Sequence, residues 1–123
     1  MQVMYVLVNE SLKMSSGKAC SQVAHAVAKL AGNLHSNVGT FGNDDPNKVV
    51  VLSAQNTTQM RNILDYLKQK EILYAAYIDE GDFETDPYAM TAIAIEPMDV
   101  DDKDVKLFER FQLYPKRGSF WRR

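Results

Sequence analysis

The spacing of hydrophobic residues differs between the first two segments of the chain. Residues Val3 to Val8 form a nearly unbroken apolar run, which is typical of a strand buried on both faces. From Lys18 to Ala31 the apolar residues recur at steps of three and four instead, and this spacing predicts a helix. We expect Gly32 and Asn33 to end the helix, because both residues tolerate the left-handed backbone conformation.

The predicted helix has two chemically different faces. At about 100° per residue, its apolar side chains gather on one side, which we expect to face the core: Cys20, Val23, Ala24, Val27, Leu30 and Ala31. The polar side chains gather on the opposite side: Lys18, Gln22, His25 and Lys29. The polar face is the first candidate functional surface. A cysteine that faces the core would be a poor reactive thiolate.

The remainder of the chain continues to alternate between strand-like and helix-like segments. Runs rich in β-branched and apolar residues predict strands at 48–53, 72–79 and 90–96. A second helix, capped by Asn56 or Thr57, is predicted from one apolar stripe: Met60, Ile63, Leu64 and Leu67. A short third helix, entered through Asp99 or Asp101, is predicted from the apolar residues Val105, Phe108 and Phe111. Residues 34–47 and 80–89 read as loops, the first with room for a brief helical turn.

The order of these elements predicts a single α/β domain. Strands that alternate with helices imply a three-layer sandwich, in which a four-stranded, mixed but mostly parallel sheet carries helices on both faces. The short loop before the fourth strand allows the last two strands to pair antiparallel. We place the domain at residues 1–114 and a basic tail at residues 115–123.

Composition places the chain among ordinary globular proteins. Its 123 residues are 46% hydrophobic and 24% charged, and no apolar run approaches the length of a membrane span. A single cysteine, Cys20, suits a reducing compartment, and the start of the chain lacks the features of a signal peptide, so the cytosol is the expected location. The net charge of −2 gives no global attraction to nucleic acid. Charge is uneven, however: residues 79–104 are strongly acidic and the tail is basic.

Two positions can carry chemistry on general grounds. Gly17 and Lys18 lie where a helix begins, and free amide groups with a lysine there would stabilise a phosphate or a developing oxyanion. The phosphate-binding loop motif of nucleotide hydrolases is absent. Asp79 ends a predicted strand, which is where open α/β sheets place their sites. The two histidines and one cysteine show no zinc-ligand spacing, and the acidic segment after Asp79 lacks the glycine and final glutamate of a calcium loop.

Taken together, these residues resemble the type 2 peptidyl-tRNA hydrolase family. The segment 12–26 is similar to the family pattern L-x-M-x-x-G-K-x-x-x-Q-x-x-H-A. The resemblance starts in the first strand, resumes at residues 48–51 and 79–81, and continues through Pro87, Thr91 and residues 94–97 to Leu113 and Tyr114. It therefore covers nearly the whole chain.

The resemblance implies hydrolysis of the ester that joins a peptide to the 3′ end of tRNA, with no metal or organic cofactor. It implies catalytic roles for Lys18, Asp79 and Thr91. Substrate-binding roles are implied for Gly17, Gln22, His25 and Lys13. Its implied partner is peptidyl-tRNA, with no membrane, and the sequence leaves open whether the chain forms a homodimer.

The sequence departs from the family pattern after Gly81. The family usually has a basic residue, threonine and glutamine there, whereas this chain has Asp82, Phe83 and Glu84. Asn9 and Ser11 stand where the family tends to have arginine and aspartate. Two alternatives to the enzyme therefore stay open: a non-catalytic protein of the same fold that binds tRNA or protein, and a hydrolase that acts on a different, less anionic substrate.

Overall fold

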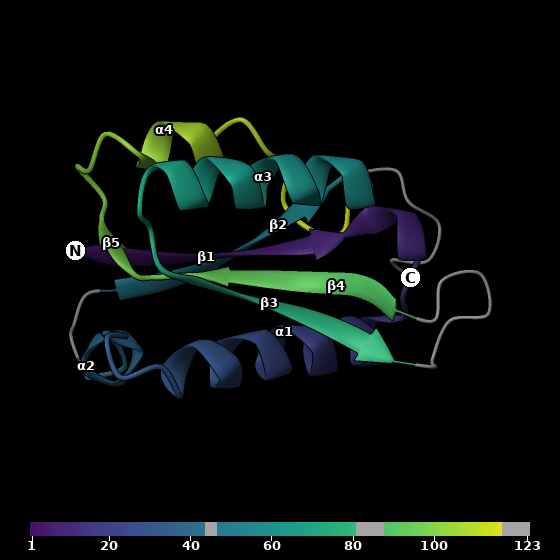
Figure 1. Ribbon diagram of the computed structural model, residues 1–123, viewed down its shortest axis with the longest axis horizontal. Coiled ribbons are helices and arrows are strands. Elements are labelled where there is room, and N and C mark those ends of the chain that lie inside the picture. The colour runs from purple at the N-terminus through teal and green to yellow at the C-terminus, as the bar shows by residue number, and fades with distance from the viewer. Residues whose placement is uncertain (44–46, 81–87, 117–123) are drawn as a thin grey trace.

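The computed structural model describes residues 1–43, 47–80 and 88–116 as three layers, with helices above and below one sheet (Figure 1). The strands are β1 (Gln2–Asn9), β2 (Asn47–Ala54), β3 (Tyr74–Glu80), β4 (Tyr88–Ile95) and the short β5 (Met98–Asp99). The helices are η1 (Glu10–Leu12, a 3-10 turn), α1 (Ser16–Ala31), α2 (Val38–Phe41), α3 (Thr57–Gln69) and α4 (Val105–Phe108). The predicted α/β class, with a mixed sheet and helices on both faces, is confirmed.

The sheet has the strand order β2-β1-β4-β3, and β5 pairs with β1. β1 pairs parallel with β2, from Gln2 opposite Asn47 to Asn9 opposite Ala54. β4 pairs antiparallel with both β1 and β3. Three strands, β1, β2 and β3, therefore run in one direction, and their carboxyl ends meet at one end of the sheet (Figure 1).

The sheet was expected to be mostly parallel, but most pairs of neighbouring strands are antiparallel. β4 lies between β1 and β3, so the long strands make one parallel and two antiparallel pairs. The physical reason is burial: from Ala89 to Ile95 the side chains of β4 are almost all buried, as a central strand requires. β3 carries more polar side chains and lies at the edge.

The ends of the two long helices follow local chemistry. The Ser15 hydroxyl caps α1 by accepting a hydrogen bond from Lys18 N (3.2 Å), and Asn56 caps α3 by accepting from Gln59 N (2.9 Å). The left-handed end predicted for the first helix is wrong, since Gly32 has a φ of −73° and continues the right-handed turn. α4 begins later than expected, at Val105, because Asp99 and Asp102 form side-chain turns before it.

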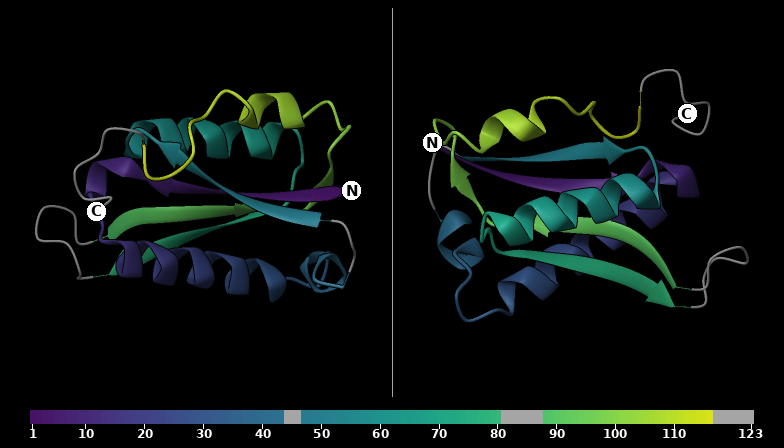
Figure 2. Two further views of the ribbon diagram at one scale, coloured as in Figure 1. Left: turned by 180° about the vertical axis from the view of Figure 1, so that it is seen from behind. Right: turned by 45° about the horizontal axis from the view of Figure 1, so that its top comes forward.

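The main core lies between the sheet and α3, with α4 at its margin (Figure 2). Leu7, Ile93 and Phe108 are fully buried there, and Tyr5 stacks on Phe108 with ring centroids 4.7 Å apart. The predicted stripe of the second helix is confirmed, since Met60, Ile63 and Leu67 are its buried residues.

The helix α1 covers the opposite face of the sheet, but it is rotated relative to the sequence prediction. Its buried residues are Ala19, Gln22, Ala26 and Leu30. Alanine at two of these positions lets the helix approach β3 and β4 closely. Because Gln22 is among the buried residues, the predicted polar face turns toward these two strands rather than away from the sheet. Cys20 and Ala24, which were expected in the core, are exposed.

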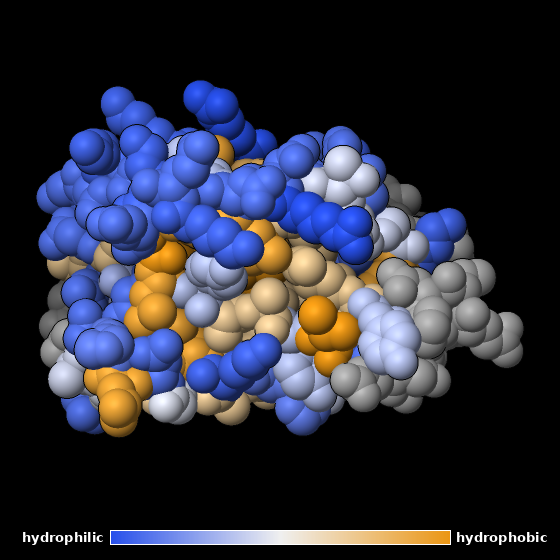
Figure 3. Space-filling view, viewed as in Figure 1, coloured by the Kyte–Doolittle hydropathy of each residue, from blue (hydrophilic) through white to orange (hydrophobic). Residues whose placement is uncertain are grey.

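Beyond α3, part of the sheet reaches the surface. Figure 3 shows apolar residues across the middle of this face, below the polar surface of α3 and α4. Ile78 of β3 and Tyr88 of β4 are 47% and 68% exposed. Apolar and aromatic side chains are therefore exposed where β3 ends and β4 begins.

Candidate functional site

The first turn of α1 and the carboxyl end of β3 bring a lysine and a carboxylate together. Lys18 Nζ lies 2.8 Å from Asp79 Oδ2, with side chains that are 31% and 11% exposed. This Asp79 oxygen is itself covered, and its partner among the described residues is the Lys18 ammonium. The contact is thus an ion pair at the rim of the sheet, in which the carboxylate keeps hydrogen-bonding capacity.

One turn after Lys18 on α1, Gln22 forms a buried polar contact with Thr91 of β4. The Thr91 hydroxyl donates to Gln22 Oε1 at 2.7 Å, and the same hydroxyl oxygen lies 3.3 Å from Tyr77 O. Thr91 is fully buried and Gln22 is 2% exposed. A buried polar pair of this kind fixes both side chains, because either group would lose free energy without the other.

A β-bulge explains why Thr91 points toward α1. On β3, Tyr77 pairs with Ala92 and Ile78 pairs with Met90, so Thr91 has no partner of its own in the register. Such an extra residue re-aims side chains, and bulges are common beside active sites. The alternation of the sequence alone could not have revealed this.

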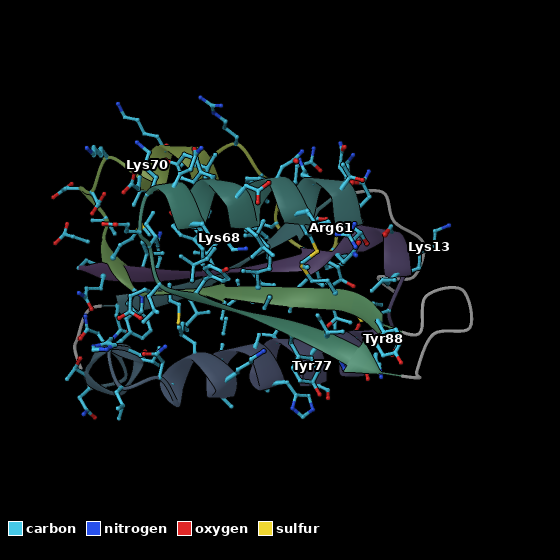
Figure 4. All side chains as sticks on the ribbon, in the orientation of Figure 1. Lys13, Arg61, Lys68, Lys70, Tyr77 and Tyr88 are labelled. Atoms are coloured by element: carbon cyan, nitrogen blue, oxygen red, sulfur yellow. The ribbon has the colours of Figure 1, made fainter. Side chains whose placement is uncertain are left out.

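Further along α1, two more polar side chains contact β3. The imidazole of His25 stacks on the ring of Tyr77, with centroids 4.6 Å apart and planes 9° from parallel. Lys29 Nζ donates to Ala76 O at 2.9 Å. Figure 4 shows Tyr77 reaching from β3 toward α1. The predicted polar face thus forms one row of contacts with β3 and β4.

Gly17 and Lys13 are the two remaining predicted site residues. A Cβ added to Gly17 would meet no atom within 4 Å, so open space lies over the start of α1. Lys13 is exposed at the end of η1, with a left-handed φ of 50°. In Figure 4 its side chain points outward from the carboxyl end of β1, away from α1.

Asn9 and Ser11 have a structural role that sequence reasoning missed. Asn9 is fully buried, and its amide donates to Thr57 Oγ1 and Met90 O, both at 3.0 Å. Asn9 Oδ1 in turn accepts from Ser11 Oγ at 2.6 Å. The two departures from the family pattern therefore pair with each other and tie β1 to α3 and β4. In the sequence, the only indication of this contact was that both residues depart from the family pattern and lie two positions apart.

Among the hollows lined by described residues, two lie elsewhere on the molecule, and Lys18 and Asp79 are not among their lining residues. One, of about 500 Å³, is an apolar groove between α1 and β2; Cys20 and Ala24 line it, together with Val49, Val51 and Tyr114. This groove corrects the expectation that Cys20 faces the core. The other, of about 300 Å³, is polar and includes Glu10, whose Oε1 accepts from Ser53 Oγ at 2.7 Å.

Within the described part of the chain, no three His, Cys, Asp or Glu side chains come together as metal ligands. No helix of that part is long and apolar enough to cross a membrane. The acidic segment Asp82–Phe83–Glu84, which bears on the alternatives to the enzyme, lies outside the described residues. Most of the basic tail also lies outside them.

The fold and the site together define a small α/β protein with a lysine–carboxylate pair at the carboxyl ends of its strands. Residues 2–114 match the family model described as Peptidyl-tRNA hydrolase PTH2. The chain therefore belongs to the PTH2 family of peptidyl-tRNA hydrolases, and the family resemblance seen in the sequence is confirmed. A search of curated proteins found no match to the chain.

Proposed function

We propose that this chain hydrolyses the ester bond between a peptide, or an N-blocked aminoacyl group, and the 3′ end of tRNA. The observation that carries the proposal is the ion pair of Lys18 and Asp79, at a rim where the start of α1 is open. Family membership supports the same reaction. An ester is already activated, so a positioned water, one base and one stabiliser of negative charge suffice.

In this mechanism Asp79 holds the attacking water and accepts its proton. The oxygen of the water attacks the ester carbonyl carbon, and negative charge develops on the carbonyl oxygen. The Lys18 ammonium and the free amide groups in the first turn of α1 stabilise that charge. Collapse of the tetrahedral intermediate then breaks the bond to the ribose oxygen, and Asp79 returns the proton to that oxygen as it leaves.

Thr91 and Gln22 act by holding the site in place. Their buried hydrogen bond joins α1 to β4 one helical turn after Lys18. Because Asp79 is on β3 and Lys18 is on α1, a shift of either element would separate the ion pair. A small misplacement of reacting groups can cost on the order of 10²-fold in rate.

Release of peptide from an N-acetylated aminoacyl-tRNA tests the proposal. We expect turnover by the unchanged chain, and a loss on the order of 10²-fold or more in kcat/KM for Lys18→Ala and for Asp79→Ala. Asp79→Asn keeps the shape but removes the base, so it should lose as much. Lys48→Ala removes an exposed lysine of β2 and serves as the matched control, with activity unchanged.

Two results would contradict the proposal. If both Lys18→Ala and Asp79→Ala keep their turnover, the ion pair takes no part in the reaction. No turnover by a folded, unchanged chain would favour the two alternatives. Binding of tRNA without hydrolysis would then identify a non-catalytic binding protein, and release from a simple ester substrate would identify a hydrolase of another substrate.

A further inference from the structure

We infer that the stacked rings of His25 and Tyr77 form a binding site for a nucleobase, and that they take the terminal adenine of the tRNA 3′ end. This inference rests on the proposed function, because it places the base relative to the ester. Three observations carry it: the geometry of the stack, its distance from the ion pair, and the charge around it.

The stack is prepared to receive a further ring. Its two rings are almost parallel, 9° apart, with centroids at 4.6 Å, which is the separation of an offset stack. Tyr77 is half-buried and supports the imidazole from the side of β3, whereas His25 is exposed. Single-stranded RNA ends are bound by proteins in this way, with unstacked bases placed on aromatic or histidine side chains.

The spacing from the ion pair matches one nucleoside. His25 follows Lys18 by seven residues, or two turns on the same face, so their backbones lie roughly 10 Å apart along α1. Tyr77 precedes Asp79 by two residues, on the same face of β3, and is about 7 Å away. An ester on the terminal ribose is separated from its own base by a distance of this order. A carbonyl held at Lys18 therefore puts that base beside His25.

The charge around the stack favours the nucleic-acid part of the substrate. Helix α1 contains no acidic residue, and its two lysines, Lys18 and Lys29, lie on the face that carries His25. Lys29 stands one turn beyond His25 and uses one of its three donors on Ala76 O. The remaining donors can reach a phosphate of the 3′ end.

Binding of two short RNA hairpins by fluorescence anisotropy tests the inference. One hairpin ends in CCA and the other lacks the terminal adenosine. The unchanged chain should bind the first more tightly, by a factor on the order of ten. His25→Leu should abolish the difference, and His25→Phe, which keeps a ring, should retain it. His35→Leu alters the other, exposed histidine and serves as the matched control.

Kinetics separate this inference from the proposed function. With peptidyl-tRNA, His25→Leu should raise KM on the order of tenfold, because it removes binding that the substrate and the transition state share. If the chain hydrolyses the substrate but His25→Leu retains both its KM and the preference for CCA, the inference is wrong and the proposed function stands. If the preference depends on His25 but no hydrolysis occurs, the stacking site stands and the proposed function is wrong.

Discussion

The contact of Gln22 with Thr91 shows how a single polar residue sets the position of α1. The glutamine occupies a buried site that the sequence pattern had assigned to a solvent-facing surface. Its amide is acceptable there because the Thr91 hydroxyl lies 2.7 Å away. An amide left without a partner in that position would lose its hydration and gain nothing in return.

This pairing predicts an unusual result for a double substitution. Thr91→Val leaves Gln22 Oε1 without its donor and should lower the free energy of unfolding by about 1–3 kcal/mol. Adding Gln22→Leu removes the stranded acceptor, so the double variant should recover much of that loss. Urea unfolding followed by circular dichroism measures both effects. Losses that simply add would show that the two side chains do not depend on each other.

At the scale of the element, α1 combines a structural and a functional demand in its first turn. Gly17 has no positive φ and no crowding that would require glycine. Glycine inside a helix is nevertheless less favourable than alanine, so stability alone does not explain its presence. Open space over a helix start is instead what a substrate needs in order to approach the backbone.

Replacing Gly17 should therefore separate stability from activity. Gly17→Ala should raise the free energy of unfolding by at most about 0.5–1 kcal/mol, the range for a helix interior, because alanine is the better helix former. The added methyl group should lower kcat/KM for peptidyl-tRNA, since it would occupy the space over the first turn. Thermal unfolding and peptide release are the two measurements. A variant that is more stable and fully active would show that the substrate does not approach the helix at Gly17.

Most elements could be predicted from the sequence because their signals are local. The strands and the stripe of α3 follow from periodicity, and Asn56 caps α3 as expected. The rotation of α1 could not be predicted, because it depends on Thr91 and Tyr77, which are far away in the sequence. The central place of β4 and the bulge at Thr91 likewise arise from pairing between strands.

For the site, too, local signals were predicted and contacts between distant segments were not. Lys18 and Asp79 were expected at a helix start and at a strand end, and the structure brings them into contact. Tyr77 was missed, although it lies two residues before Asp79 and so on the same face of β3. Lys13 was assigned to substrate binding by resemblance alone, and that role stays a prediction.

On the scale of the whole molecule, the net charge does not explain how a nucleic acid would bind, and the charges close to the site matter more. The net charge of −2 does not attract a polyanion, but α1 itself carries two lysines and no acidic residue. Lys18 is paired with Asp79, and Lys29 is therefore the lysine better placed to contact a phosphate. Phosphate contacts should therefore be few. For each phosphate contact, the logarithm of the binding constant falls by about 0.7–0.9 when the logarithm of the salt concentration rises by one.

Salt should thus affect binding more than chemistry. Between 50 and 200 mM salt, one to three phosphate contacts predict a rise in KM for peptidyl-tRNA of roughly threefold to thirtyfold. The change in kcat should be small, because the ion pair is partly shielded from solvent. Initial rates measured over this range provide the test. A KM that does not change with salt would mean that the lysines of α1 contact no phosphate.

The central claim is that Lys18 and Asp79 act as one unit in ester hydrolysis, and a double-variant comparison tests it most directly. Peptide release from N-acetylated aminoacyl-tRNA would be measured for the unchanged chain, Lys18→Ala, Asp79→Ala and the variant with both changes. Groups that act together lose activity non-additively. The account predicts that the double variant is about as slow as either single variant. A double variant whose loss is the product of two independent losses, or single variants with unimpaired turnover, would contradict it.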